Sequence, residues 1–178
     1  MVNEEKIIDY LKKNYRDEII YPESTDDIPT EKQLVYILTY EEDPIVLGRG
    51  KKIRARVIFD DTKTITKPHK KALLVRLYWL YGDKTKFKRY ILDTTDPAKV
   101  EKELHAKFGG NKNDIPQEFK NKLFDGVEEG SRLELILQQA FFSSYDGLAD
   151  IRKWNRHKLL DKSLLSQIKT KLKLVDLK

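Results

Sequence analysis

The first 33 residues show a helical apolar pattern followed by a stretch with no pattern. A helix capped by Asn3 would carry Glu4 and Glu5 in its first turn. Residues 21–30 contain two prolines and three acidic residues without periodicity, which is typical of a loop or linker. The helix would bury one face, made of Ile7, Ile8, Leu11 and Tyr15.

Residues 34–113 alternate between short apolar runs and longer segments with helical spacing. Two runs of β-branched and aromatic residues on either side of an acidic turn favour a β-hairpin. Residues 54–59 fit a helix or a strand equally well. The remaining pattern predicts a helix from Pro68 to Tyr81 ended by Gly82, a strand at 87–94, and a helix that starts at Asp96-Pro97 and ends at Gly109.

Beyond Asn113 the pattern is helical. Ser131 and Glu134 have the spacing of a capping box, and Ser163 is placed to cap a last helix. The expected fold is α/β (α+β), with a small three-stranded, mostly antiparallel sheet flanked by helices. We expect a single core at 34–113, preceded by a helix and linker at 1–33 and followed by a helical extension at 114–178 that packs on it.

The composition of the chain limits which partners and which metal ligands are expected. The chain has 35 basic and 29 acidic residues, a net charge of +6, which favours a polyanionic partner if the basic groups cluster. It has no cysteine and three histidines, so a metal would be held mainly by oxygen. No apolar run approaches the ~18 residues of a membrane span, and we expect a soluble, cytoplasmic protein without membrane contact.

Charge is unevenly distributed along the chain. Residues 152–178 contain nine basic and two acidic residues, a net charge of +7, whereas the first 33 residues carry a net charge of −4. The basic segment with Trp154, Asn155, Arg156 and His157 suits the DNA backbone. A solvated surface helix explains the same composition equally well.

A second basic cluster, RGKKIRAR, places five basic residues in the eight positions 49–56. Gly48 and Gly50 beside it favour a loop whose backbone can approach a phosphate, although a solvated face is the alternative. The side chains expected to contact nucleic acid are Arg49, Lys51, Lys52, Arg54, His69 and Lys71.

Two tripeptides and the residues that follow them carry a family resemblance. Leu34-Val35-Tyr36 and Val46-Leu47-Gly48 resemble the motifs that name the GIY-YIG nuclease superfamily, in a restriction-like or repair-like branch. Arg49 and Arg56 match two basic positions of its excision-repair branch. Glu101 and Asn113, twelve residues apart, match the superfamily's metal-binding glutamate and its asparagine. The apolar positions between them are Leu104 and Phe108.

The resemblance implies a divalent-metal-dependent DNA endonuclease, restriction or defence related, acting on double-stranded DNA. Glu101 would bind Mg²⁺ or Mn²⁺, with waters and phosphate oxygens as the other ligands. Arg56 would stabilise transition-state charge, Tyr36 would position or deprotonate the water, and Asn113 would orient these groups. Val46 departs from the family, which has a tyrosine there.

Each of these assignments has a structural alternative. Tyr36 also suits a core aromatic residue, Glu101 a solvated helix face, and His105 either helix packing or the outer shell of the metal. Glu103 fits the spacing less well than Glu101, and Arg54 competes with Arg56.

Two other functions remain open. One is a non-catalytic nucleic-acid-binding protein on a degenerate nuclease scaffold, and the other is a small helical interaction protein. The oligomeric state is open, with a dimer among the options.

Overall fold

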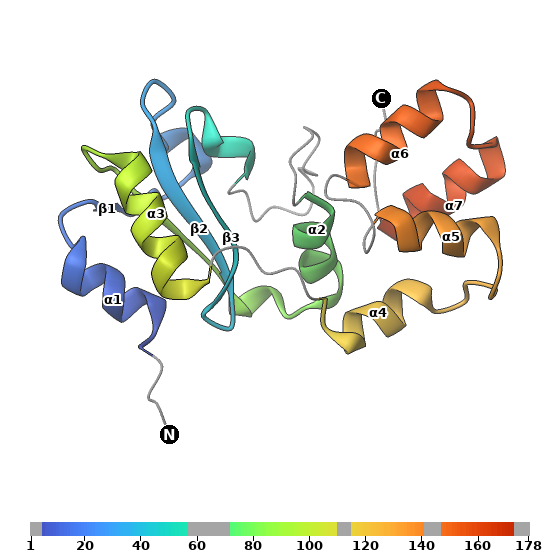
Figure 1. Ribbon diagram of the computed structural model, residues 1–178, viewed down its shortest axis with the longest axis horizontal. Helices are drawn as coiled ribbons and strands as arrows, with labels where there is room; N and C mark the ends of the chain where they lie inside the picture. Colours follow the sequence, from blue (N-terminus) through green and yellow to red (C-terminus); the bar gives the residue numbers. More distant parts are fainter. Residues whose placement is uncertain (1–4, 57–71, 110–114, 141–146, 173–178) are drawn as a thin grey trace. The chain divides into compact units, whose positions relative to one another are not determined.

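The computed structural model describes residues 5–56, 72–109, 115–140 and 147–172. The fold is a mixed α/β arrangement that divides into two compact units (Figure 1). The first comprises Met1–Phe59 and Asp83–Asp114, and the second comprises Asp60–Gly82 and Ile115–Lys178. The helix and linker expected at 1–33 lie within the bounds of the first unit.

The first unit contains the sheet. Its elements are α1 (Ile7–Asn14), β1 (Ile19–Ile20), the 3-10 helix η1 (Thr25–Asp27), β2 (Leu34–Tyr40), β3 (Asp43–Gly50), η2 (Ile53–Arg56), η3 (Lys84–Lys86), β4 (Phe87–Leu92) and α3 (Pro97–Phe108).

The sheet has four strands in the order β1-β4-β2-β3, with antiparallel pairing throughout. The antiparallel prediction is confirmed, but the predicted number of three strands is wrong. The additional strand is Ile19–Ile20, which pairs with Leu92 and Ile91 of β4. Two residues are too few to show an alternating pattern, so only the long-range pairing reveals this strand.

The β2–β3 turn uses a conformation that L-residues rarely adopt. Tyr40 pairs with Asp43, and the two residues between them, Glu41 and Glu42, have φ angles of 54° and 68°. Positive φ at both positions matches the twist of a two-residue hairpin, where Asn-Gly is the usual sequence. Lys86 and Lys88, from η3 and β4, form ion pairs with Glu41 and Glu42, respectively, which help to hold this turn.

Helix α3 begins and ends where its sequence predicts. The Asp96 side chain accepts a hydrogen bond from the Lys99 backbone N at 3.2 Å, and Pro97 occupies the first turn. Gly109 ends the helix at φ 76°, in the left-handed region. These caps fix the register of the helix and therefore the direction of each of its side chains.

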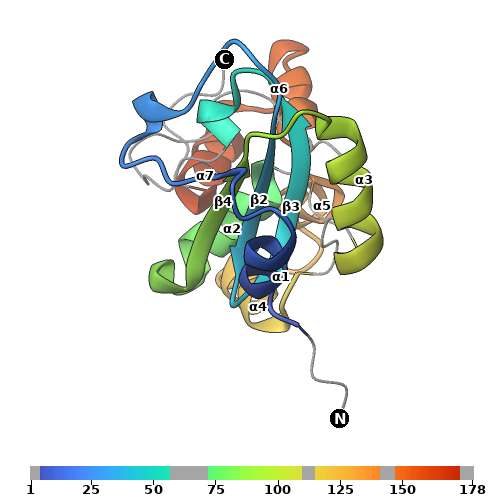
Figure 2. The ribbon, with the colours of Figure 1, turned by 90° about the vertical axis from the view of Figure 1, so that its left-hand side faces the viewer.

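Helices α1 and α3 cover one face of the sheet (Figure 2). The core on this face combines every second residue of the strands with the apolar stripes of the two helices. Its members are Ile7, Leu11, Tyr15, Ile19, Val35, Ile37, Leu47, Tyr90, Leu92, Val100 and Leu104. The N-terminal helix is therefore part of the core of this unit.

The opposite face of β2 and β3 carries the residues between those of the core. Tyr36 pairs with Gly48, and Leu38 pairs with Val46. A Cβ atom added at Gly48 would lie 2.8 Å from the Tyr36 hydroxyl oxygen and 3.0 Å from its Cζ. The absence of a side chain at Gly48 therefore makes room for the ring of Tyr36.

The second unit is helical in its described part. It contains α2 (Ala72–Tyr81), α4 (Gln117–Phe124), α5 (Arg132–Gln138), α6 (Gly147–Arg156) and α7 (Lys162–Leu172). Tyr78 of α2 meets Phe119 of α4 edge to face, with ring centroids 5.0 Å apart. Contacts of this kind group α2 with the C-terminal helices. Gly82 follows α2 as predicted, whereas the predicted helix start at Pro68 lies outside the described residues.

The helix caps of the second unit match the prediction in part. Ser131 accepts a hydrogen bond from the Glu134 backbone N at 3.2 Å, while the Glu134 carboxylate accepts one from Gly130 N. The predicted cap of α7 at Ser163 is wrong. Asp161 has this role, since its side chain accepts a hydrogen bond from Leu164 N at 2.7 Å. None of the described helices is both long and apolar enough to cross a membrane.

We expect Gly48→Ala to lower the free energy of unfolding by about 1–3 kcal/mol, because the new methyl group overpacks against the buried ring of Tyr36. Urea denaturation measures the loss. In a Tyr36→Phe background, which removes the atom at 2.8 Å, the same substitution should cost less. Equal losses in the two backgrounds would contradict the contact.

Candidate functional site

A three-residue polar cluster lies between β3 and α3. The Nε atom of Arg49 is 2.6 Å from Oε2 of Glu101, and Nε2 of His105 is 3.7 Å from Oε1 of the same carboxylate. The Glu101 side chain is 24% exposed, so solvent and ligands can reach it. This cluster, made of Arg49, Glu101 and His105, is called the Glu101 cluster below.

The fold explains how the Glu101 cluster forms. Arg49 pairs with Val35 across the hairpin and therefore points to the face that α3 covers. On α3, Val100 and Leu104 pack into the core, which leaves Glu101 beside β3 and places His105 one turn later. All three residues are predicted from the sequence, but the Arg49–Glu101 pair is not. Strand alternation from Leu47 was the signal that could have indicated it.

The two glutamates of α3 have different partners. Glu103 accepts a hydrogen bond from the Tyr15 hydroxyl at 2.5 Å. Burial and this carboxylate together raise the pKa of Tyr15 well above its ordinary value. Tyr15 belongs to the core, so Glu103 supports the packing of α1 on α3. Glu101 is the glutamate that meets a basic group and a histidine.

Tyr36 lies on the other face of the sheet. It is 2% exposed, and strand alternation separates it from Val35 and Ile37, which pack towards α3. The structure therefore does not bring the Tyr36 hydroxyl together with Glu101. Val46, the departure from the family motif, is also 2% exposed on this second face.

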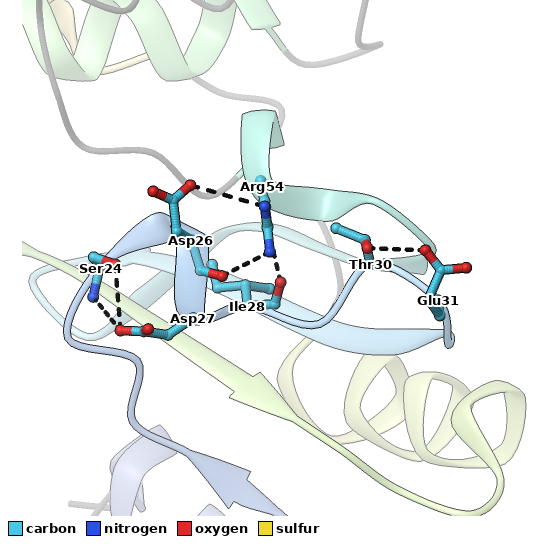
Figure 3. Close-up of polar contacts among 7 residues, drawn as sticks. All are labelled: Ser24, Asp26, Asp27, Ile28, Thr30, Glu31 and Arg54. Carbon is cyan, nitrogen blue, oxygen red and sulfur yellow. Dashed lines mark hydrogen bonds and ion pairs between the residues drawn. The ribbon is translucent and has the colours of Figure 1, made fainter.

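The predicted basic loop divides into held and exposed side chains. Arg54 donates hydrogen bonds to the backbone oxygens of Ile28 and Asp26 at 2.9 and 2.6 Å, and its guanidinium lies 3.8 Å from the Asp26 carboxylate (Figure 3). Arg54 thus anchors the segment around η1 to η2. Lys51 and Lys52 are exposed.

Four of the predicted site residues lie wholly or partly outside the described residues. Asn113, His69 and Lys71 lie entirely outside them. Of Arg56, only the backbone is described, and it ends η2. Among the predicted site residues that the structure does describe, an ion pair joins Arg49 to Glu101.

The donor set of the Glu101 cluster fits a hard divalent cation only sparsely. Within the described ranges, no group of three or more histidine or acidic side chains could hold a metal. Glu101 offers carboxylate oxygens, and waters and phosphate oxygens would have to complete the six positions around Mg²⁺. Such a site depends on its substrate for much of its metal affinity.

Comparisons with models of known protein families, with curated proteins and with solved structures find no match to this chain.

We expect Glu103→Ala to destabilise the fold more than Glu101→Ala. Loss of Glu103 leaves the Tyr15 hydroxyl without this partner, at a cost of roughly 1 kcal/mol or more. Loss of Glu101 removes a partly exposed ion pair that contributes about 0–1 kcal/mol. Chemical denaturation of both variants measures the difference, and Tyr15→Phe should restore much of the stability of Glu103→Ala. The opposite order of stability would contradict these roles.

Proposed function

We propose that this chain is a divalent-metal-dependent DNA endonuclease whose chemistry is centred on Glu101. The observation that carries the proposal is the Glu101 cluster, in which a partly exposed carboxylate has an arginine and a histidine as neighbours. The cluster also supports the resemblance to GIY-YIG nucleases, because it joins the basic residue after Gly48 to the glutamate of the family's helix.

Phosphodiester hydrolysis requires an activated water, positive charge to offset the growing charge on the phosphate, and help for the leaving oxygen, and this cluster can supply the first two. A water oxygen adds to phosphorus while one P–O ester bond breaks, so negative charge grows on the phosphoryl oxygens. Mg²⁺ or Mn²⁺, bound through Glu101, would offset that charge and lower the pKa of a coordinated water. Arg49 carries forked donors that suit a phosphate, and it holds Glu101 in place before substrate arrives.

His105 is the member of the cluster whose imidazole ring can act as a general acid or base. It lies one helical turn from Glu101 and is 35% exposed, so a water between the two side chains is accessible from solvent. We therefore assign proton transfer to His105 in place of Tyr36, whose burial supports a core role. Arg56 and Asn113 keep the roles that the resemblance implies as predictions.

Glu101→Gln should abolish cleavage of supercoiled plasmid DNA in Mg²⁺, because an amide is a poor ligand for the cation. We expect a loss on the order of 10² or more, the scale of removing a charge-stabilising group. Glu103→Gln is the matched control, two residues away on the same helix, and should keep most of the activity. Loss of cleavage in Glu103→Gln alone would move the metal site to that residue.

In the same cleavage assay, Tyr36→Phe tests the assignment of proton transfer to His105 in place of Tyr36. Activity close to that of the wild type supports the buried role of Tyr36, whereas a loss as large as that of Glu101→Gln would assign the water to its hydroxyl.

A second function is favoured by a specific observation. The position of the second motif tyrosine is the buried Val46, so the family's full set of phenols is absent from β2 and β3. A nucleic-acid-binding protein on a degenerate nuclease scaffold would bind DNA without cutting it. Binding in a gel-shift assay with no cleavage in Mg²⁺ or Mn²⁺ would favour this function over the endonuclease.

A further inference from the structure

The C-terminal end of α6 presents a row of basic side chains to solvent. Lys153, Arg156 and His157 are spaced three and four residues apart and therefore share one helix face, and Lys158 follows them. All four residues are exposed. None of them forms an ion pair with another residue that the structure describes. These four residues are called the basic α6 end.

Many basic side chains of the first unit are, by contrast, already neutralised. Each of them meets a carboxylate of the same unit, as in the pairs Lys32–Asp93, Arg49–Glu101, Arg54–Asp26, Lys86–Glu41, Lys88–Glu42 and Lys107–Glu5. A paired cation contributes less to binding a polyanion, because its carboxylate partner repels the ligand. The basic α6 end has no such partner among the described residues.

The backbone at Lys158 provides a second, independent observation. Helix α6 closes with a Schellman motif, in which Leu159 N donates to Trp154 O at 2.9 Å and Lys158 N donates to Asn155 O at 3.0 Å. The residue in the left-handed position of this motif is usually glycine, but here it is Lys158, with φ 56°. A lysine at this position carries a backbone strain that a glycine would avoid.

We propose that the basic α6 end binds the phosphate backbone of DNA. The choice of DNA as the polyanion rests on the proposed function. Lys153, Arg156 and Lys158 present positive charge that no described carboxylate neutralises, which suits phosphates and carries no base readout. The affinity of the chain for DNA then depends on its second unit more than on Arg49 or Arg54.

The test compares two triple variants that remove the same charge. Lys153→Gln, Arg156→Gln and Lys158→Gly together neutralise the basic α6 end, and Lys12→Gln, Lys13→Gln and Lys99→Gln neutralise three exposed lysines of the first unit. Fluorescence anisotropy with a labelled DNA duplex, in EDTA, measures affinity at several salt concentrations. The α6 variant should bind at least about tenfold more weakly, and its salt slope should be smaller by about 0.9 for each phosphate that it no longer neutralises.

The control variant shows whether weaker binding results from loss of the basic α6 end or from the lower net charge of the chain. It should bind within about twofold of the wild type, because its three lysines do not belong to the basic α6 end and their loss lowers only the net charge. Equal weakening of both triple variants would reduce the effect to net charge and overturn the proposal. Unchanged binding of the α6 variant would overturn it as well.

Lys158→Gly alone separates binding from folding. Glycine relieves the left-handed strain, so the melting temperature should rise while the affinity for the duplex falls by about two- to fivefold. A rise in melting temperature with unchanged affinity would assign Lys158 to the helix cap only and remove it from the binding surface.

The binding measurement stands apart from catalysis because EDTA removes the metal. Loss of duplex binding in the α6 variant, with no cleavage by any variant, would end the endonuclease proposal and leave this one intact. Cleavage by the wild type, together with full duplex binding by the α6 variant, would overturn the proposal for the basic α6 end and leave the endonuclease proposal intact.

Discussion

In the β2–β3 hairpin, a shift of the pairing register by one residue would move the side chains of the shifted strand to the opposite face of the sheet. The observed register places Tyr36 opposite Gly48 and Val35 opposite Arg49. The first pairing fills the space above a glycine with an aromatic ring, and the second directs a guanidinium towards α3. The Glu101 cluster therefore depends on the same register that buries Tyr36. The turn at Glu41 and Glu42 closes the hairpin with two residues, and an irregularity between Leu38 and Thr39 then shifts the pairing by one residue to give this register.

In the first unit, some of the basic side chains that contribute to the net charge are already held by ion pairs and hydrogen bonds within the fold. The five basic residues at 49–56 indicate an anion-binding loop when only the sequence is considered. In the fold, Arg49 meets Glu101 and Arg54 is bonded to the backbone of Ile28 and Asp26. These two arginines hold elements of the unit together, which leaves Lys51 and Lys52, in the described part of the loop, without an ion pair to another described residue. Clustering along the sequence thus overstates the positive charge that a ligand would meet.

The sequence predicts local features well and long-range ones poorly. The cap at Asp96, the stop at Gly109 and the cap at Ser131 are confirmed, because each depends on residues within one helical turn. Strand β1 was missed, since its two residues acquire their structure by pairing with β4. Asp161 was passed over for Ser163 because both suit a cap two residues apart, and only the observed helix start separates them.

The sequence predicts which residues belong to the candidate site, but not which of them lie in contact. Glu101 and Arg49 were both named from the sequence, yet their contact requires the pairing of β2 with β3 and the docking of α3. Tyr36 was named for a hydroxyl that the fold buries on the second face. A motif names residues but does not say on which face of a sheet each lies, and the face becomes clear only when the packing partners are known.

Helical geometry finally decides between the two glutamates of α3. Two residues along an α-helix correspond to about 200° of rotation, so Glu101 and Glu103 point to nearly opposite sides. One side meets Tyr15 of the N-terminal helix, and the other meets Arg49 of β3. Glu103 is thereby committed to the packing of α1, whereas Glu101 is partly exposed and pairs with Arg49, a group that can also bind a phosphate. A carboxylate whose partner is exchangeable can serve a metal and a substrate without loss of the fold, and this property supports Glu101 as the centre of the proposed chemistry.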